Sequence, residues 1–427
     1  MRVSFGQHQP DGARWFQRPK RQTNYNADNT PPRSPVTRRK ALSELIVFLA
    51  GSPLLQAQFS PRRSHQRAPS FDEIASVLEF EPLAQAKITQ RAYDYIAGGV
   101  ESEFSLRRNR KAFDWATLIP RAVADVSSMD LSLDVFGRIM SSPILVAPTA
   151  GHQQLHRDGE KETHRGATAA GATMVVSTNA SYPLDQVASA ADGPLWSQLY
   201  VRRDREAARG RVETAVEVGC HAICFTVDTQ YGSLRERLTH DRHLTAAAAA
   251  QQTTRARRQR RRRNELPNPY RLRFSDAQLD WKFVDELRSW TDLPILIKGL
   301  LTAEDAERAI NQGADGIVVS NHGARYLEYA PATIEVLPEI SNAVAGRIPV
   351  FIDGGFRRGS DILKALALGA TAVLVGRPPL WGLGAFGAAG TQRVLEILQT
   401  ELALAMSHTG CARISDADAS VVVTDFP

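Results

Sequence analysis

The chain has 427 residues and a formal net charge of +6, with 43% hydrophobic and 23% charged residues. This length allows one large domain or two to three small ones, and the apolar fraction is sufficient for a large core. The three cysteines, Cys220, Cys224 and Cys411, are too few for a disulfide framework. They also lack the paired Cys/His spacing of a zinc site, so we expect no metal.

The positive charge is confined to two segments. Residues 1–67 carry +9 and residues 255–263 carry +7, so the total of +6 leaves −10 for the rest of the chain. An acidic body argues against nucleic-acid binding as the function of the core, because a basic surface is the usual mark of that function.

Residues 1–70 are rich in Pro, Arg, Gln and Asn and show no sustained periodicity, which predicts a disordered extension. Within it, twin arginines precede a short apolar run, and residues 37–58 resemble a twin-arginine export signal. The signal predicts a periplasmic location and a plain extension predicts a cytoplasmic one. The sequence leaves both open, but the run is too short for a membrane-spanning helix.

Residues 71–115 are predicted to be helical. Ser70 is a favourable N-cap residue, and the apolar residues from Ile74 onward follow a helical period. The stretch 92–99 contains Tyr95 and ends in a glycine pair that is typical of a helix end.

From residue 143 onward, short apolar runs alternate with amphipathic segments, which is typical of parallel strands with helical crossovers. Eight such units predict a closed (β/α)₈ TIM barrel, an α/β fold, within a domain of residues 71–420. No G-x-G-x-x-G motif follows the first strand, which argues against a dinucleotide-binding sheet. The predicted strands are 143–148, 173–178, 195–200, 222–228, 294–299, 316–321, 349–354 and 372–377. The predicted helices include 160–170, 204–218, 303–312, 334–344 and 360–368.

One connection is much longer than the others. An inserted basic loop at about 240–272 separates the fourth and fifth predicted strands and contains the arginine run 255–263. Long loops in compact domains are usually functional lids or disordered segments. We expect a disordered loop, with a basic contact to a membrane surface or polyanion as the alternative.

Polar and charged residues follow nearly every predicted strand. The carboxyl ends of TIM-barrel strands meet on one face, where the active site lies. His322 and Arg325 follow the sixth strand, as expected for a general base beside a carboxylate clamp. Asp228, after the fourth strand, is placed to orient His322 and raise its pKa. Lys298 ends the fifth strand without an evident partner in sequence, which suits a cation beside a cofactor ring or a salt bridge inside the barrel.

Two loops rich in glycine and arginine follow the last two strands, at 353–359 and at Gly376-Arg377. TIM barrels commonly bind phosphate at these loops, because glycine exposes backbone N–H groups and arginine adds bidentate positive charge. The sequence therefore predicts a phosphate-bearing ligand at this end of the barrel.

With these residues in place, the chain resembles the FMN-dependent α-hydroxy-acid oxidising family, which includes glycolate oxidase, lactate oxidase and mandelate dehydrogenase. The resemblance covers about residues 72–415. Its most specific motif is Ser320-Asn321-His322-Gly323-Ala324-Arg325, followed by Ala330-Pro331-Ala332-Thr333 and reinforced by Lys298-Gly299 and Gly376-Arg377-Pro378.

The resemblance implies FMN as the cofactor and oxidation of a small L-2-hydroxy acid to the 2-oxo acid. It leaves open whether oxygen, a quinone or a cytochrome accepts the electrons, and it implies a homotetramer. Catalytic roles are implied for His322, Asp228, Lys298 and Tyr200, and substrate contacts for Tyr95, Tyr200, Arg235, His322, Arg325 and Asn179. FMN contacts are implied for Ala147, Thr149, Ser177, Gln198, Thr226, Lys298, Ser320, Asp353, Gly355, Arg357, Gly376 and Arg377.

One position departs from the family pattern. Asn179 stands where glycolate oxidase-like members carry tryptophan, which implies an altered substrate side chain. Two alternative functions remain open on the sequence alone. Another FMN barrel enzyme, such as an isopentenyl diphosphate isomerase, gives no reason for His322 and Arg325 to lie together. A non-catalytic flavin-binding protein would have no need for a base and a carboxylate clamp, so the presence of His322 and Arg325 argues against it.

Overall fold

A computed structural model describes residues 69–202, 204–238 and 279–427. The chain divides into Met1–Gln66 and Arg67–Pro427, and the described residues all belong to the second unit. The expected export signal at 37–58 and the basic loop at 240–272 therefore lie outside the described residues. Within the described residues, no helix is both long enough and apolar enough to cross a membrane.

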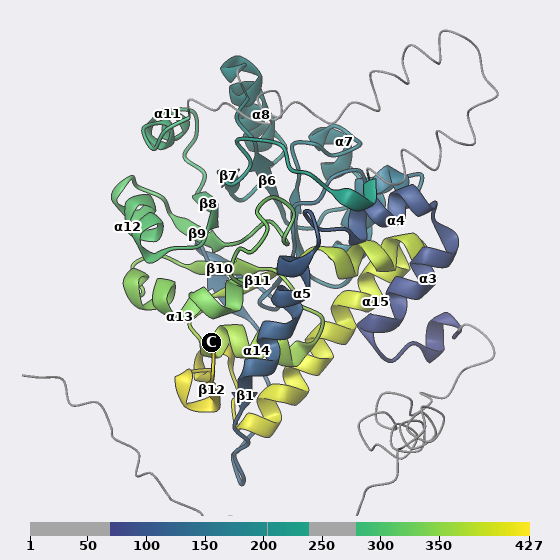
Figure 1. Cartoon of the computed structure of the whole chain (residues 1–427), viewed down its shortest axis with the longest axis vertical. Coiled ribbons are helices and arrows are strands. Elements are labelled where there is room, and N and C mark those ends of the chain that lie inside the picture. The colour runs from purple at the N-terminus through teal and green to yellow at the C-terminus, as the bar shows by residue number, and fades with distance from the viewer. Residues whose placement is uncertain (1–68, 203, 239–278) are drawn as a thin grey trace, which may run out of the picture. The chain divides into compact units, whose positions relative to one another are not determined.

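Eight parallel strands form a closed barrel, which confirms the predicted TIM barrel (Figure 1). The strands are short and their residues are almost all buried, because helices cover the outside and side chains fill the inside. In barrel order they are β10 (Val350–Asp353), β11 (Ala372–Val375), β4 (Ile144–Val146), β5 (Thr173–Val176), β6 (Leu195–Leu199), β7 (Ile223–Thr226), β8 (Ile295–Leu300) and β9 (Gly316–Val319).

Successive residues on each strand face two different cores. Leu145 belongs to the cluster inside the barrel, with Trp196 and Phe351. Its neighbours Ile144 and Val146 belong to the cluster between strands and helices. This alternation follows from the two-residue period of a strand and explains why the runs are apolar throughout.

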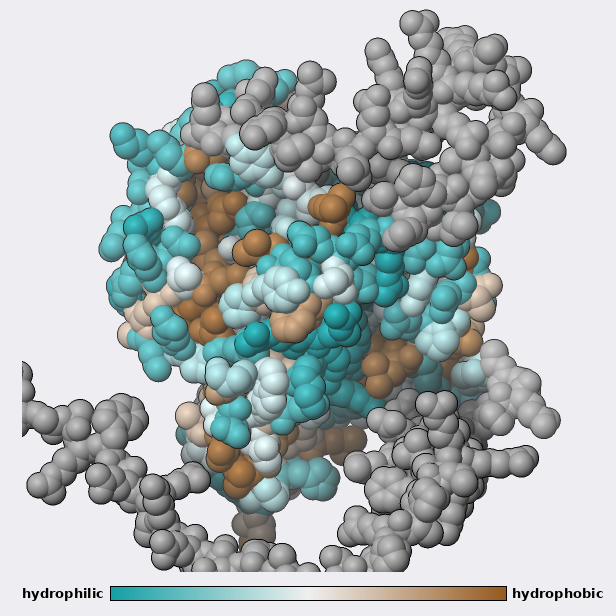
Figure 2. Space-filling model, in the orientation of Figure 1, coloured by the Kyte–Doolittle hydropathy of each residue, from teal (hydrophilic) through white to brown (hydrophobic). Residues whose placement is uncertain are grey.

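Helices pack around the barrel between the strands, and five of them match the predicted segments within one or two residues. Figure 2 shows that the visible face of this layer is largely hydrophilic, with apolar patches between the helices, as expected for amphipathic helices. The helices are α6 (Gly159–Ala169), α7 (Leu184–Ala188), α8 (Arg205–Glu217), α11 (Phe283–Arg288), α12 (Ala303–Asn311), α13 (Thr333–Val344), α14 (Gly359–Ala367) and α15 (Arg377–Thr409).

The long helix α15 was not predicted, and it is kinked rather than straight. It packs against α3, α6 and α14, and Figure 1 shows it running along the side of the molecule beside α3. The kink lies at Phe386 and Gly387, where the backbone is not helical. The Glu162 carboxylate accepts a 3.0 Å hydrogen bond from the N–H of Ala388 and so starts the second half of the helix.

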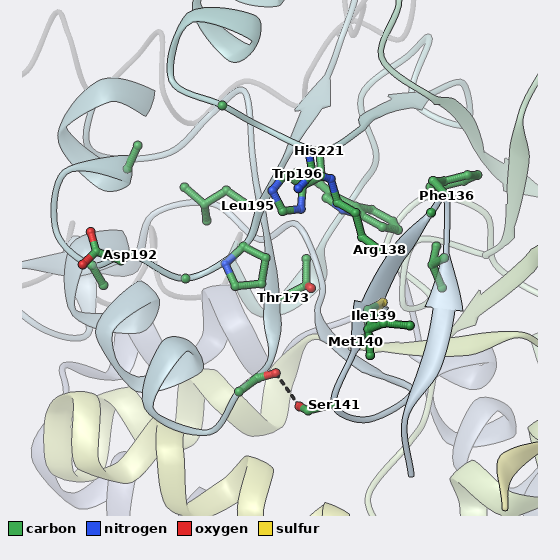
Figure 3. A pocket seen from close by; sticks show the side chains of 18 of the residues that line it. Phe136, Arg138, Ile139, Met140, Ser141, Thr173, Asp192, Leu195, Trp196 and His221 are labelled. Atoms are coloured by element: carbon green, nitrogen blue, oxygen red, sulfur yellow. Dashed lines mark hydrogen bonds between the residues drawn. The ribbon is translucent and has the colours of Figure 1, made fainter. Parts of the chain in front are cut away.

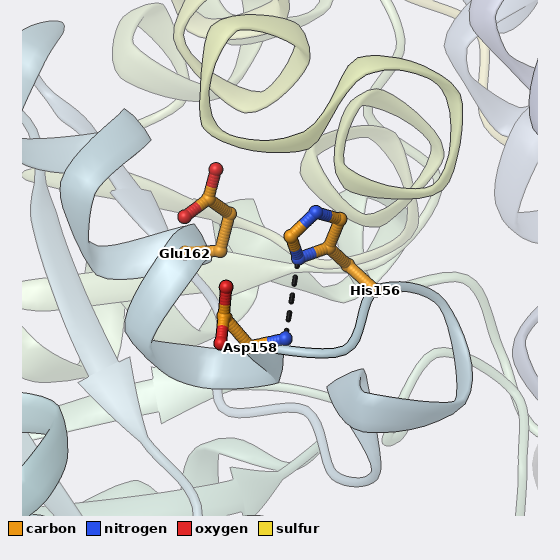
Figure 4. Close-up of side chains that lie close together, drawn as sticks. All are labelled: His156, Asp158 and Glu162. Carbon is orange, nitrogen blue, oxygen red and sulfur yellow. Dashed lines mark hydrogen bonds between the residues drawn. The ribbon is translucent and has the colours of Figure 1, made fainter.

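Figure 4 shows the side chains beside this kink. His156, Asp158 and Glu162 lie close together, and each has protein partners. The Asp158 N–H lies 3.3 Å from His156 Nδ1, and Arg165 forms a 2.8 Å salt bridge with Glu162. These contacts give the cluster a structural role at the kink.

The N-terminal segment is helical, but it is broken into several short pieces. They are η1 (Phe71–Glu73), η2 (Val77–Glu79), α3 (Phe80–Lys87), α4 (Gln90–Ala97), α5 (Phe104–Lys111) and η3 (Ala112–Trp115). The Thr89 hydroxyl caps α4 by accepting from the N–H of Ala92. Helix α4 ends at Gly98, which brings Tyr95 to the carboxyl ends of the barrel strands.

A hairpin lies at the opposite end of the barrel. Strands β2 (Leu133–Val135) and β3 (Arg138–Met140) pair antiparallel, and the turn residue Phe136 lies 6.0 Å from Trp196 and 6.4 Å from Phe351 between ring centroids. A second small sheet joins β1 (Ala116–Leu118) to β12 (Val422–Thr424) near the C-terminus (Figure 1). The hairpin thus packs against the inner core where the strands begin.

Candidate active site

A cavity of about 450 Å³ opens at the carboxyl ends of the barrel strands. It receives residues from helix α4, from most of the strand ends and from the loop after β9. Fifteen of the residues expected from sequence line it, namely Tyr95, Ala147, Thr149, Ser177, Asn179, Tyr200, Arg235, Lys298, His322, Arg325, Asp353, Gly355, Arg357, Gly376 and Arg377. The other four lie behind the wall. Gln198, Asp228 and Ser320 bond to the wall residues Ser177, His322 and Lys298, and Thr226 bonds to Gln198.

His322 is held at both ring nitrogens. Nδ1 lies 2.9 Å from Asp228 Oδ1, and Nε2 lies 3.3 Å from the hydroxyl of Tyr200. Because a carboxylate only accepts, Nδ1 carries the proton and Nε2 of the neutral ring is left as the basic nitrogen. Nε2 is therefore the atom of His322 that can take a proton from a molecule in the cavity.

The pKa values of this pair move in the same direction. Burial lowers the pKa of His322, and although Asp228 opposes this, the positive charges of Lys298 and Arg325 support it. Burial alone raises the pKa of Asp228, but His322 and Lys298 outweigh it, so its carboxyl pKa lies below the usual value. The expected pairing with Asp228 and its raising effect on the pKa of His322 are confirmed, but burial exceeds the effect of the carboxylate, so the pKa lies below its ordinary value.

The loop that carries His322 has an unusual backbone. His322, Gly323 and Ala324 have φ values of 56°, 61° and 59°, a left-handed region that residues other than glycine rarely adopt. Asn321 stabilises the loop by accepting from the Ala324 N–H and by exchanging two side-chain hydrogen bonds with Asn109 of α5, at 2.7 and 2.9 Å. Asn109 was not expected from the sequence.

Lys298 is not the isolated cation that its sequence context suggested. Its ammonium lies 2.9 Å from Asp353 Oδ2 and 2.7 Å from the hydroxyl of Ser320, which in turn donates to Asp353 Oδ1. Burial alone lowers the pKa of Lys298, but Asp353 and Asp228 outweigh it and hold the pKa above its ordinary value. The lysine is therefore charged, almost fully buried and part of the cavity wall.

Gly299 lies in a bulge directly after Lys298. The pairing of β8 with β9 shifts register between Lys298 and Leu300, and Gly299 in the bulge has a φ of 112°. A Cβ at this position would lie 2.6 Å from the Cβ of Asp228. Glycine is thus required for both the bulge and the close approach of the aspartate that holds His322.

Two arginines flank the ring of Tyr95. The guanidinium carbons of Arg235 and Arg325 lie 5.3 and 5.2 Å from its centroid. Arg325 also donates to the backbone carbonyls of Tyr95, Ile96 and Gly98, at 2.9 to 3.3 Å. Burial, together with the nearby charge of Arg235, lowers the pKa of Arg325 to about 10. The two guanidinium groups therefore repel each other, and an anion between them would relieve that repulsion.

Two further arginines line the cavity beside the loops after β10 and β11. Arg357 donates one hydrogen bond, to the carbonyl of Phe356, and the rest of its five N–H groups have no partner among the described residues. Arg377 donates to the carbonyls of Ile96, Gly98 and Gly323. Burial lowers the pKa of both groups, that of Arg377 well below its ordinary value. Partly unpaired cationic groups in a cavity wall suit a phosphate.

The glycines and the start of α15 also fit a phosphate. Gly354 and Gly355 have φ values of 105° and 85°, and a Cβ on Gly355 would meet the carbonyl of Asn109 at 2.2 Å. Helix α15 begins after Gly376 with no capping side chain, and helix starts favour anions. The residues present therefore fit the predicted phosphate group, and they fit the phosphate and ribityl chain of FMN that the family resemblance implies.

The remaining expected FMN contacts form a network across three strands. The Gln198 Oε1 accepts from the backbone N–H of Thr178 and the hydroxyl of Ser177, and its Nε2 donates 3.0 Å to Thr226. Thr149 lies at the end of β4, with its hydroxyl 2.7 Å from Nε2 of His152. These bonds fix the polar edge of the cavity.

Three residues of the site were missed by sequence reasoning. Tyr326 lines the cavity, Asn109 bonds to Asn321 next to His322, and His152 bonds to the wall residue Thr149. Asn109 lies more than 200 positions before its partner, so no local pattern signals the pair. Tyr326 directly follows Arg325, and its position in the motif was the one signal available.

Comparisons with known proteins agree with this geometry. The family model described as FMN-dependent dehydrogenase matches residues 84–424. The chain is 42% identical over 355 residues to the peroxisomal (S)-2-hydroxy-acid oxidase GLO4 of Oryza sativa subsp. japonica. The aligned region covers 82% of this chain and 96% of that protein. The chain is also 42% identical over 359 residues to glycolate oxidase 3 of Arabidopsis thaliana, covering 83% and 97%.

Solved structures give the same result. A crystal structure of mandelate oxidase superimposes with a TM-score of 0.72 at 37% sequence identity, covering 83% of this chain and 99% of that one. The names of these relatives are those of oxidases that act on 2-hydroxy acids, and the family model spans most of the chain. The chain therefore belongs to the FMN-dependent dehydrogenase family and is an FMN-dependent oxidoreductase that acts on 2-hydroxy acids.

Proposed function

We propose that His322 is the base of the reaction and that Asp228 orients it. The observation that carries this proposal is the geometry of the imidazole. Its Nδ1 is bonded to Asp228, and its basic Nε2 faces Tyr200 at the wall of the same cavity as both clamp arginines. A lowered pKa keeps the ring neutral at neutral pH, which a base requires.

Arg325 and Arg235 bind the substrate carboxylate, and Tyr95 and Tyr200 donate hydrogen bonds to the substrate. A carboxylate placed between the two guanidinium groups relieves their mutual repulsion and fixes the molecule at one end. The α-carbon is then held in one orientation with its hydroxyl near His322 Nε2. Bound FMN supplies the redox chemistry by accepting the two electrons as the 2-hydroxy acid becomes a 2-oxo acid.

Lys298 places a fixed positive charge in the wall where the cofactor ring binds. Because Asp353 and Ser320 hold its ammonium, the charge needs no rearrangement when negative charge develops nearby. Arg357, Arg377, Gly355 and Gly376 hold the phosphate end. Ala147, Thr149, Ser177, Gln198 and Thr226 contact the ring and ribityl chain.

The test is His322→Asn, measured by anaerobic bleaching of the flavin with an L-2-hydroxy acid in a stopped-flow instrument. We expect the reduction rate to fall about 10²–10⁴-fold while FMN content stays at the wild-type level. His408→Asn, on the last turn of α15, is the control and should bleach at the wild-type rate. Reduction of the His322 variant at a near-wild-type rate would disprove the assignment.

We propose oxygen as the electron acceptor, because the named relatives and structural neighbours are oxidases. The measurement is the rate at which the reduced flavin reoxidises in air-saturated buffer, compared with the rate with a soluble quinone or cytochrome c. Oxygen should reoxidise the flavin fast enough to sustain turnover. Slow reoxidation in air with fast reoxidation by a quinone or cytochrome would assign a dehydrogenase.

We propose a substrate side chain larger than the hydrogen of glycolate. Asn179 lines the cavity and is smaller than the tryptophan of glycolate oxidase-like members. Its side-chain oxygen accepts a 2.6 Å hydrogen bond from Arg202, which leaves the amide N–H groups for an acceptor on the substrate. A panel of L-2-hydroxy acids should show a higher kcat/KM for longer side chains than for glycolate, and Asn179→Trp should reverse that order.

Three proposals rest on the sequence. A homotetramer is proposed from the family resemblance and is tested by light scattering of the purified protein. Export through the segment 37–58 is tested by fractionating cells that produce the full chain. The domain limits, a catalytic barrel of 71–420 with a disordered extension and an inserted loop at 240–272, are tested by limited proteolysis with mass spectrometry.

A further inference from the structure

The imidazole of His322 lies between two tyrosine rings. The ring of Tyr326 meets it edge to face, with centroids 4.7 Å apart and an interplanar angle of 74°. The ring of Tyr200 is nearly parallel to it, at 6.4 Å and 22°. Tyr200 belongs to the expected site, whereas Tyr326 does not, although it lines the same cavity.

Tyr326 shares the wall of the cavity with both arginines of the carboxylate clamp, Arg235 and Arg325. Burial raises the pKa of Tyr326 to about 12, with opposing contributions from Arg235 and Arg325 and supporting ones from Asp228 and Tyr95. All of these residues except Asp228 line the same cavity as Tyr326, and Asp228 is bonded to His322 directly behind its wall. The phenol is therefore protonated at neutral pH and is a hydrogen-bond donor beside both guanidinium groups.

A second tyrosine on the same loop makes a clear contrast. Tyr329 lies three residues later, is 70% exposed and packs its ring on Phe104 with centroids 4.8 Å apart. It does not line the cavity within the described structure. The loop therefore directs one tyrosine toward the site and one toward the surface, and the two provide a matched pair for comparison.

The contact with Tyr326 restricts a motion that the two hydrogen bonds of His322 restrain only in part. The 2.9 Å bond from Nδ1 to Asp228 fixes one edge of the imidazole, whereas the 3.3 Å bond between Nε2 and the Tyr200 hydroxyl is long and holds the opposite edge more weakly against tilting. Because an aromatic edge against the ring blocks tilting, the direction of Nε2 is set by Asp228 and Tyr326 together. Misplacement of a reacting group by even a small distance is costly in rate.

We propose that Tyr326 is a positioning residue with two separable contributions. Its ring holds His322 in the orientation in which Nε2 faces the substrate, and its hydroxyl donates a hydrogen bond to the substrate carboxylate beside Arg235 and Arg325. This inference rests on the proposed roles of His322 and the clamp.

Two substitutions separate the contributions. Tyr326→Phe removes the hydroxyl and keeps the ring, so KM for an L-2-hydroxy acid should rise about 10-fold while the anaerobic reduction rate at saturation changes little. Tyr326→Leu removes the ring, so the reduction rate at saturation should fall about 10–100-fold. Tyr329→Phe and Tyr329→Leu are the matched controls and should leave both quantities at the wild-type values.

The pH profile gives a readout that a purely structural role does not affect. The groups that face His322 are Asp228, Lys298, Arg325, Tyr200 and Tyr326. Because burial is the largest cause of its lowered pKa, removing the Tyr326 ring admits water and raises that pKa toward the ordinary value. The acid limb of the reduction-rate profile should therefore move to higher pH in Tyr326→Leu and stay in place in Tyr326→Phe.

FMN content and melting temperature are measured for every variant. If Tyr326→Leu does not fold, Tyr326→Met takes its place, because methionine also lacks the ring and has a volume similar to that of leucine. A wild-type rate and pH profile without the ring would overturn the positioning role, and an unchanged KM in Tyr326→Phe would overturn the role of the hydroxyl. These failures differ from failure of the proposed function, which His322→Asn reports separately.

Discussion

The two ends of the barrel both contain a cavity, and the larger one is at the end without the expected site. The cavity at the carboxyl ends measures about 450 Å³, whereas the one at the amino ends, beside the β2–β3 hairpin, measures about 840 Å³. Figure 3 shows the second cavity, which is lined by Phe136, Arg138, Trp196 and His221 among others. Cavity size therefore does not identify the functional end.

The two ends differ in how charge and burial are combined. At the carboxyl ends, Lys298, Asp228, His322 and Arg325 lie within one connected set, and burial is the largest influence on the pKa of each. At the amino ends, burial lowers the pKa of His221, with Arg138 as the second cause, and the hairpin contributes mostly apolar contacts. Buried charges are costly unless a partner or ligand offsets them, so their concentration marks the site.

The largest effect is expected from a substitution that removes a charge from the buried group of Lys298, Asp228, His322 and Arg325. Asp228→Asn keeps the shape of the side chain but removes the carboxylate that holds the Nδ1 proton of His322. We expect the anaerobic flavin reduction rate to fall about 10²–10⁴-fold, because the tautomer and orientation of the base are no longer fixed.

The same variant tests the sign of the electrostatic coupling. Asp228 raises the pKa of His322 against the effect of burial, so its removal lowers that pKa further. A base must be unprotonated to act, and the acid limb of the residual activity should therefore move to lower pH. A shift to higher pH would show that Asp228 does not face the imidazole as a carboxylate in solution. Asp280→Asn, on the segment before α11, is the control and should leave rate and profile unchanged.

The second-largest effect tests whether the guanidinium groups of Arg235 and Arg325 bind the substrate carboxylate. Arg325→Lys keeps one positive charge but loses the fork that bonds a carboxylate with two N–H groups. It also breaks the hydrogen bonds to the carbonyls of Tyr95, Ile96 and Gly98. We expect kcat/KM for an L-2-hydroxy acid to fall about 10²-fold, chiefly through KM. Arg308→Lys, in an exposed pair on α12, should leave kcat/KM within about twofold.

The carboxyl end could be predicted from sequence because a parallel barrel brings the strand ends together. Eight short apolar runs were enough to place His322, Lys298 and Asp353 on one face, although they are far apart in the chain. Their connections were harder to predict. Lys298 pairs with Asp353 and is followed by a bulge at Gly299, and no periodicity in the sequence reveals either feature.

Other features had no local signal in the sequence. Helix α15 begins with two prolines and contains several glycines in its first half, which are weak helix formers. Tertiary packing against α3, α6 and α14 overrides that propensity. Tyr326 and Tyr329 look equivalent in sequence, and the strained backbone of the loop decides which of them faces the cavity. The direction of a side chain in an irregular loop does not follow a fixed period.

The third effect appears at the amino ends and concerns stability. Phe136→Ala removes the ring that packs between Trp196 and Phe351. Because Phe136 is half-buried, we expect a loss of about 2 kcal/mol in the free energy of unfolding, below the 3–5 kcal/mol typical of a fully buried phenylalanine. Urea unfolding followed by tryptophan fluorescence measures it. Ile139→Ala, at a 74% exposed position of the same hairpin, should cost little. A slower flavin reduction in the folded Phe136 variant would contradict a purely structural role.

The smallest expected effect compares the residues that flank strand β7, a histidine before it and the aspartate that holds His322 after it. His221 precedes β7 and Asp228 follows it, so the two residues lie roughly 20 Å apart along an extended chain. Because the separation is large and the lowered pKa of His221 leaves its ring mostly neutral at neutral pH, His221 has little electrostatic effect on the imidazole of His322. His221→Ala should change the flavin reduction rate by less than about twofold and leave the acid limb in place. If the acid limb of the pH profile moves, the charge of His221 acts through the barrel core on His322. Distance would then not isolate the two ends electrostatically, and the degree of burial alone would distinguish the catalytic end from the structural one.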